Sequence, residues 1–159
     1  MTSRADLTVH VEVEQLYHRY AYAVDQLDTE VLADCYDEQA SFHCSLGDAG
    51  TQRGRDAIVA RQVFRHERER FRETHLITNV VVLEVDEPRA QTYAAAAIFS
   101  TRAGETCFET TGHYEDELHR GEDGLWRFTR RSFVTDRSAP AVVPPQRTPA
   151  APAQTNRRG

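Results

Sequence analysis

Three side chains of this sequence belong to the residue types that move protons in enzymes. Tyr20 and Asp25 lie five residues apart in the string HRYAYAVDQLD, and His75 opens the string HLITN. A carboxylate beside an imidazole orients the ring, and a positioned His, Asp or Tyr can act as a general acid or base. Two structural interpretations stay open on spacing alone: Asp25 as a helix-end or capping residue, and His75 as a hydrogen-bonded core residue.

The rest of the sequence lacks the motifs of other catalytic classes. It contains no GxSxG, HExxH, GxGxxG, phosphate loop or EF-hand loop. It also contains no lysine, which excludes Schiff-base chemistry and a phosphate-loop lysine. The seven histidines have no metal-ligand spacing, and three widely spaced cysteines argue against disulfides and structural zinc. We therefore expect no metal and no cofactor, which leaves acid–base chemistry or binding without chemistry.

Hydrophobic periodicity predicts helices first and strands afterwards. A first helix carries apolar residues at steps of three and four from Val13 to Leu27, Asp28 caps a short second helix, and a third helix runs from about Asp56 to Phe71. Four β-rich segments follow: His75–Val85, Ala90–Thr101, Glu105–His119 and Leu125–Asp136. Three N-terminal helices and an antiparallel meander predict an α+β domain, in which a strongly bent sheet closes over the helices and leaves a pocket.

The helical and strand patterns select five candidate substrate-binding residues. Tyr17 shares the apolar face of the first helix with Tyr20, and Asn79 shares a strand face with His75 by alternation. His113 and Tyr114 point to opposite faces of their strand, so only one of them can line a pocket. The candidates are Tyr17, Asn79, Tyr93, His113 and Tyr114.

Charge and composition exclude several partners. The net charge is −6, which disfavours nucleic acid because phosphate neutralisation dominates that binding. The third helix mixes arginines with glutamates, and we interpret the face with Arg61 and Arg65 as solvated and salt-bridged. No apolar run approaches the ~20 residues of a membrane helix, and no signal-peptide core is present. We expect a cytoplasmic protein that binds a small molecule and not a membrane.

Apolar residues on both faces of the His75 strand predict a homodimer. Leu76, Val80 and Val82 alternate with Ile77 and Val81 along this strand. Because only one face can line the pocket, the other needs a cover, and a two-fold interface is the commonest one.

Four segments resemble, in order and spacing, the SnoaL-like branch of the nuclear transport factor 2-like proteins: LYHRYAYAVDQLDTEVLADCYDEQASF, TQRGRDAI, THLITN and GHYEDELHRGEDGLWRFTRRSF. The resemblance covers about Val13 to Thr135 and implies a cone-shaped fold with a pocket. The superfamily includes polyketide cyclases, scytalone and bile-acid dehydratases, ketosteroid isomerase and limonene epoxide hydrolase. It also includes the non-catalytic small subunits of ring-hydroxylating dioxygenases, so the fold alone does not decide function.

The resemblance to the dehydratases is strongest at the site. Their tyrosine and aspartate, five residues apart on the first helix, match Tyr20 and Asp25, and their strand-opening histidine matches His75. The sequence departs from them on the next strand, where a further His or Asp is replaced by the alanines from Ala94 to Ala97. Either Asp25 and His75 act alone, or another group supplies the missing partner, or the protein is not an enzyme. The candidates for that group are His43, His113 and Asp116.

The leading hypothesis is a cofactor-independent dehydratase, cyclase or isomerase that acts on a small, largely apolar carbonyl compound in secondary or small-molecule metabolism. In this hypothesis His75, oriented by Asp25, takes a proton beside the carbonyl, and Tyr20 hydrogen-bonds the enolate oxygen. The alternative is a non-catalytic ligand-binding or subunit protein of the same fold, which the alanine strand favours.

Residues 138–159 hold five of the six prolines and little to bury, which predicts a disordered tail after a folded domain at residues 8–137. Truncation after Arg137 should leave the thermal midpoint within about 2 °C of the full chain, because such a tail contributes no buried contacts. Differential scanning calorimetry of both forms measures this. A larger fall would mean that the tail docks on the domain.

Overall fold

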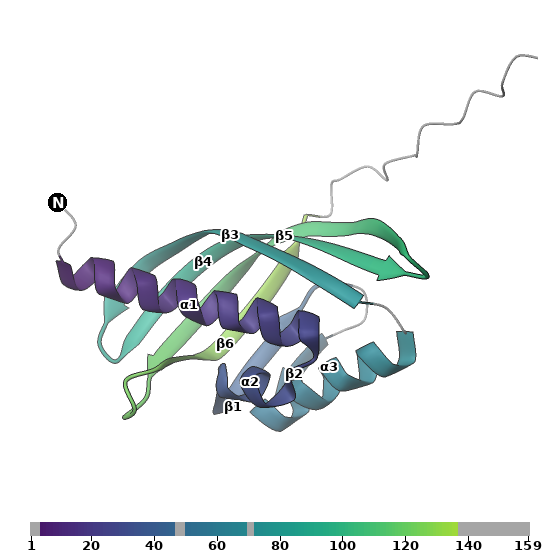
Figure 1. The fold of residues 1–159 in the computed structure, drawn as a ribbon. Coiled ribbons are helices and arrows are strands. Elements are labelled where there is room, and N and C mark those ends of the chain that lie inside the picture. Colours follow the sequence, from purple (N-terminus) through teal and green to yellow (C-terminus); the bar gives the residue numbers. More distant parts are fainter. Residues whose placement is uncertain (1–3, 47–49, 70–71, 137–159) are drawn as a thin grey trace, which may run out of the picture.

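The computed structural model describes residues 4–46, 50–69 and 72–136, so the predicted tail lies outside the described residues. Within these ranges the chain forms three helices and six strands (Figure 1). The helices are α1 (Arg4–Gln26), α2 (Thr29–Asp34) and α3 (Arg55–Glu69). The strands are β1 (Tyr36–Cys44), β2 (Gly50–Arg53), β3 (Arg72–Asp86), β4 (Arg89–Arg102), β5 (Glu105–Arg120) and β6 (Trp126–Thr135).

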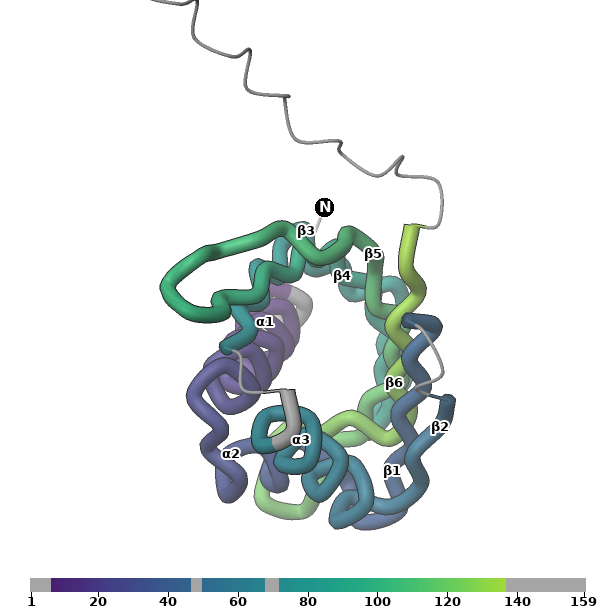
Figure 2. The backbone as a smooth tube through the Cα atoms, turned by 90° about the vertical axis from the view of Figure 1, so that its right-hand side faces the viewer, coloured from purple at the N-terminus to yellow at the C-terminus, as the bar shows by residue number. Residues whose placement is uncertain are grey.

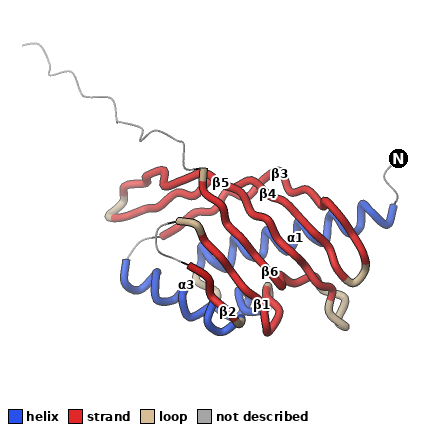
Figure 3. Tube along the Cα trace, turned by 180° about the vertical axis from the view of Figure 1, so that it is seen from behind, coloured by secondary structure: helices blue, strands red, loops and turns tan. Residues whose placement is uncertain are grey.

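The strands form one sheet in the order β2-β1-β6-β5-β4-β3. The long strands β3 to β6 form the predicted antiparallel meander, but β1 pairs with β6 in parallel, which the sequence order did not indicate. Seen from behind, the strands lie in front of the helices (Figure 3). The predicted α+β class is therefore confirmed, with a parallel pair added to the antiparallel sheet.

The sheet is strongly curled, and the helices occupy its concave side. Figure 2 shows the sheet running from β3 through β5 and β6 to β2, with α1, α2 and α3 along the opposite side. The core between the two layers includes Val13, Leu16 and Val24 of α1, all of which are buried. These are positions that the helical periodicity assigned to the inner face.

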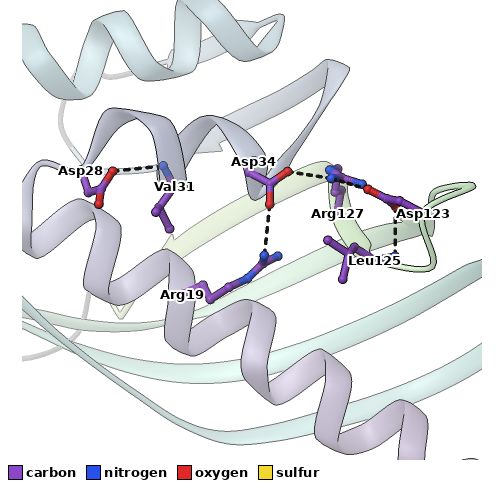
Figure 4. Close-up of polar contacts among 7 residues, drawn as sticks. All are labelled: Arg19, Asp28, Val31, Asp34, Asp123, Leu125 and Arg127. Carbon is purple, nitrogen blue, oxygen red and sulfur yellow. Dashed lines mark hydrogen bonds and ion pairs between the residues drawn. The ribbon is translucent and has the colours of Figure 1, made fainter.

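Polar contacts fix the short helix α2 between α1 and β6 (Figure 4). Asp28 caps α2 as predicted, and its Oδ1 accepts a hydrogen bond from the Val31 amide at 3.1 Å. At the other end of α2, Asp34 accepts hydrogen bonds from Arg19 at 3.1 Å and from Arg127 at 2.6 Å. One carboxylate thus links a residue of α1 to a residue of β6.

A β-bulge in β3 changes which residues face inward. The register with β4 shifts between Thr78 and Val81, and Asn79 lies there with a φ of 53°. Because the extra residue inverts the alternation, Val80 packs against the core beyond the bulge while Val81 is 44% exposed. The prediction that His75, Asn79 and Val81 share one face is therefore wrong for the residues beyond Thr78.

A second bulge, in β5, has the same effect. Ile98 of β4 pairs with Thr110 and Phe99 pairs with Phe108, so Glu109 is the extra residue. Glu109 turns toward the concave side, whereas Phe108 is 47% exposed. Tyr114 and Asp116, further along the same strand, are buried and identify the inner set that sequence parity left open.

The guanidinium of Arg131 on β6 is a fully buried cation in the core. Its Cζ lies 3.9 Å from the ring centroid of Tyr20, 3.8 Å from that of Tyr114 and 4.0 Å from that of Phe128. Aromatic ring faces attract a cation through their quadrupole, and this attraction is strongest where water is excluded. Its Nη1 also lies 3.4 Å from Oδ2 of Asp116, which completes a buried ion pair.

Asp116 is held by hydrogen bonds as well as by Arg131. Its Oδ2 accepts from the Tyr17 hydroxyl at 2.7 Å and its Oδ1 from the Ser132 amide at 3.3 Å. Burial raises the pKa of Asp116 to about 6, although the positive charge of Arg131 and these hydrogen bonds act in the opposite direction. The folded protein therefore binds a proton at this carboxyl at a higher pH than the unfolded chain does.

This shift predicts a pH dependence of stability that belongs to Asp116. Between about pH 4 and pH 6 the folded state carries the extra proton, so the free energy of unfolding falls as the pH rises through this window. The variant Asp116→Asn cannot titrate. The wild type should therefore gain about 1–3 kcal/mol relative to the variant between pH 7 and pH 4.5 in urea unfolding. A difference between the two proteins that does not change with pH would contradict this assignment.

Candidate active site

The curled sheet and the helices enclose a cavity of about 430 Å³, a size that suits a small organic molecule. Its inner wall is largely apolar and aromatic, with side chains from all three helices and from β1, β3, β4, β5 and β6. The buried lining residues are Tyr20, Val24, Leu32, Tyr36, Ile58, His75, Ile98, Tyr114 and Phe133. The long strands that the sequence predicted thus meet the helices around one cavity.

Asp25 and His75 form a direct pair at the edge of this cavity. His75 Nδ1 lies 2.7 Å from Asp25 Oδ1, and the His75 backbone amide donates to Oδ2 of the same carboxylate at 3.0 Å. The His75 side chain is 5% exposed and that of Asp25 is 17% exposed. His75 lines the cavity, and Asp25 lies behind it as the group that orients the ring.

This contact fixes the role of each imidazole nitrogen. When Nδ1–H donates a hydrogen bond to the Asp25 carboxylate, Nε2 carries a lone pair and can accept a proton. Asp25 lies in the last turn of α1, where the helix dipole disfavours a carboxylate and a cap would have to donate to carbonyl groups. The contacts of Asp25 therefore do not support the helix-end interpretation, because its partners are the backbone amide and the ring Nδ1 of His75.

Three tyrosines supply hydroxyl groups to the buried wall. Tyr20, Tyr36 and Tyr114 are all buried, and burial raises the pKa of each phenol far above its ordinary value. They stay protonated and can donate hydrogen bonds. The Tyr36 hydroxyl has no hydrogen-bond partner within the described residues. A buried donor without a partner is costly, and a bound ligand oxygen would satisfy it.

The structure separates the residues predicted from sequence into two groups. Tyr20, His75 and Tyr114 line the cavity, with Asp25 behind His75. The other four predicted residues, Tyr17, Asn79, Tyr93 and His113, are not part of its lining.

Each of these four side chains is removed from the cavity for a physical reason. The Tyr17 hydroxyl is used by Asp116 at 2.7 Å and Thr92 at 2.8 Å in the core. Asn79 occupies the β3 bulge and is exposed. Tyr93 and His113 stack on each other at 5.3 Å from adjacent strands, on the opposite sheet face from buried Tyr114.

None of the three groups considered as a second acid–base residue lines the cavity. His43 is exposed and contacts Thr51 at 3.0 Å, and Asp116 is buried behind Tyr17. His113 lies on the outer face with Tyr93. Two other carboxylates do line the cavity, Glu73 at the start of β3 and Glu109 in the β5 bulge.

The basic part of the cavity was not predicted. Arg61 and Arg65 of α3 line it beside Gln62, together with Arg102 at the end of β4. The steps of three and four from buried Ile58 to Arg61, Gln62 and Arg65 could have placed them on the inner face. The predicted salt bridging of this face is present between Arg65 and Glu73, but Arg61 and Arg65 line the cavity and do not form an outer face.

Two further searches concern other classes of site. No group of three or more His, Cys, Asp or Glu side chains that could hold a metal ion occurs in the described ranges. None of the helices described is long and apolar enough to cross a membrane.

Solved structures of similar fold include proteins from Mycobacterium tuberculosis, Catenulispora acidiphila and Novosphingobium aromaticivorans. Rv3472 of Mycobacterium tuberculosis, a protein of unknown function, is 27% identical over 86% of this chain and 78% of its own, with a TM-score of 0.75. A Catenulispora acidiphila protein in complex with S-DNPA is 25% identical over 82% of this chain and 95% of its own, with a TM-score of 0.72.

A proposed scytalone dehydratase from Novosphingobium aromaticivorans supports the fold alone. It is 22% identical over 82% of this chain and 85% of its own, with a TM-score of 0.70. No curated protein sequence is significantly similar to the chain. The SnoaL-like domain family, in contrast, matches residues 5–132, which is most of the chain. With its curled sheet, enclosed cavity and this match, the chain belongs to the SnoaL-like domain family.

Proposed function

We propose that the protein is a cofactor-independent acid–base enzyme, a dehydratase, cyclase or isomerase for a small, largely apolar carbonyl compound. One observation carries the proposal: His75, which lines the cavity, has its Nδ1 2.7 Å from a carboxylate that also binds its backbone amide. An imidazole held at Nδ1 by a carboxylate, with no described residue hydrogen-bonded to its Nε2, can act as a positioned general base. The small molecule bound in the similar Catenulispora acidiphila structure supports a small-molecule ligand.

The first step in this proposal is proton removal beside the carbonyl. His75 Nε2 takes a proton from the adjacent carbon, and Asp25 stabilises the imidazolium that forms. The negative charge moves to the carbonyl oxygen. Tyr20, Tyr36 or Tyr114 donates a hydrogen bond to that oxygen, and the fixed positive charge of Arg131 lies directly behind the Tyr20 and Tyr114 rings.

The second step differs between an isomerase and a dehydratase. In an isomerase the imidazolium returns its proton to another carbon of the enolate. In a dehydratase it protonates a β-hydroxyl, which leaves as water while the enolate becomes an enone.

Glu109 is a further carboxylate in the lining, two strands from His75, since His75 pairs with Ile98 and Ile98 pairs with Thr110. Two strand spacings are about 10 Å, so Glu109 would reach the far end of a ligand and not His75 itself.

The alternative function, a non-catalytic ligand-binding or subunit protein, has one observation in its favour. Ala94 and Ala96 are the inward residues of β4 where the dehydratases that the sequence resembles carry a titratable side chain. A pocket that binds without chemistry needs no such group.

The Asp25–His75 pair gives the test between these functions. Asp25→Asn and His75→Ala should each lower the rate of α-proton exchange of 2-tetralone in D₂O by about 10²–10⁴-fold, the usual contribution of a positioned proton carrier. The double variant should be hardly slower than either single variant, because groups that act as a unit lose function non-additively. Proton NMR of the ketone measures the exchange.

His113→Ala is the matched control, since it removes a histidine from the outer face of the same sheet. Thermal melting of all four variants gives the fraction folded. Variants that are destabilised by about 1–3 kcal/mol but exchange normally per folded molecule would identify a structural hydrogen bond instead. Wild-type protein without exchange activity would favour the binding alternative.

We also infer that the protein is a homodimer that uses the outer face of β3. This strand is at the edge of the sheet, and Leu76, Val81 and Leu83 are 44–63% exposed along it. Exposed apolar patches of this kind mark association surfaces.

The dimer makes a separate prediction for Leu83→Arg. A charge placed among the exposed apolar residues of β3 should convert the dimer to a monomer, because an unpaired charge is costly at an interface. Sedimentation velocity at micromolar concentration measures this. Glu122→Arg, in the exposed β5–β6 turn, is the control and should remain dimeric. A wild type that sediments as a monomer would refute the inference.

A further inference from the structure

The polarity of the cavity changes with depth. Its most buried lining residues are each at most 4% exposed: Tyr20, Val24, Leu32, Tyr36, Ile58, Tyr114 and Phe133. Its partly or fully exposed lining includes Arg61, Gln62, Arg65, Arg102 and Glu109. A ligand that fills the cavity would therefore meet phenols and apolar surface at one end and guanidinium groups at the other.

Most of the charges near the opening are already paired. Arg65 Nη2 lies 2.7 Å from Glu73 Oε1, and Gln62 Nε2 donates to the other oxygen of the same carboxylate at 3.2 Å. Glu109 accepts a hydrogen bond from the buried Ser100 hydroxyl. These contacts hold the rim together and leave little capacity for a ligand.

Arg61 is different from its neighbours. It lines the cavity and is partly buried, yet it makes no ion pair or hydrogen bond with any residue in the described parts of the chain. It lies one turn from Arg65 on the same face of α3, and the lining carboxylate of Glu73 is already paired with Arg65. A partly desolvated guanidinium without a counter-ion attracts an anion strongly, and its planar fork matches a carboxylate.

The position of Arg61 contrasts with the rest of the molecule. The chain carries a net charge of −6, so an anionic ligand is repelled by most of the surface. A cationic group at the cavity entrance would therefore direct an anionic ligand to this site, whereas on a basic protein many other sites would compete for it.

We propose that the cavity takes a flat, apolar ligand with a carboxylate at one end, and that Arg61 binds this carboxylate at the opening. The proposal rests on the proposed function, since it names the substrate class of the same cavity. It places the reacting carbon at the depth of His75 and the phenols, while the carboxylate stays near α3. Arg61 is then a specificity residue and takes no part in proton transfer.

Binding of 2-naphthoate and of its neutral isostere 2-naphthamide tests the proposal by isothermal titration calorimetry. The wild type should bind 2-naphthoate at least about tenfold more tightly, the usual effect of a hydrogen bond to a charged group. Arg61→Gln should abolish this preference, and Arg61→Lys should keep part of it. Arg55→Gln is the matched control, because Arg55 is on the same helix, outside the lining, and pairs with Glu38 at 3.6 Å.

Two results would overturn the proposal: equal binding of the two probes by the wild type, or an unchanged preference in Arg61→Gln. His75→Ala separates this test from the test of catalysis, because it should keep the preference for 2-naphthoate while it loses proton exchange. A protein with the preference but no exchange would retain the carboxylate site and lose the proposed reaction. A protein with proton exchange but no preference for 2-naphthoate would retain the proposed reaction and lose the carboxylate site.

Discussion

The buried guanidinium of Arg131 is the constraint on which the rest of the domain depends. An arginine side chain cannot lose its proton, so its charge must be compensated wherever it is buried. Here the compensation comes from Asp116 on β5 and from aromatic rings on α1, β5 and β6. These partners belong to separate elements, which must meet at one point. The same tyrosine rings that surround the cation then form the wall of the cavity, so core packing and site construction have one origin.

The layers of the fold follow from periodicity, but two features of the sheet do not. Steps of three and four predicted α1 and α3 to within their end turns, apart from an earlier start of α1, and β-rich runs predicted β3 to β6. The parallel β1–β6 pair depends on a long-range contact that no local pattern encodes. The bulges at Asn79 and Glu109 add one residue each, so alternation counted across either bulge gives the wrong face. In β3 this holds up to the next register shift, between Val82 and Glu84.

The residues of the candidate site could be predicted from sequence where the residue type and its place in a helix or strand both indicated a site. Asp25 and His75 stood out because a carboxylate at a helix end and a histidine among aliphatic residues need partners, and each is the partner of the other. Tyr17 and Tyr20 were indistinguishable in sequence, since both are on the inner helix face, and only packing assigns one to Asp116 and the other to the cavity. The sequence did not distinguish Arg131 from its neighbour Arg130, which is exposed and pairs with Glu117 at 2.6 Å. Burial, not residue type, separates these two arginines.

The positions of Arg131 and Arg61 also give the two ends of the cavity different responses to ionic strength. Counterions cannot approach Arg131, which has no exposed surface, so its field at the inner wall is hardly screened at any salt concentration. Arg61 lies at the open end, where dissolved ions screen a charge over about 8 Å at physiological ionic strength. Added salt would therefore weaken the attraction between Arg61 and an anionic ligand at the entrance without changing the field of Arg131 at the inner wall. In the proposed reaction, ligand binding at the entrance and charge stabilisation at the inner wall would thus depend on two guanidinium groups, one reached by solvent and the other not.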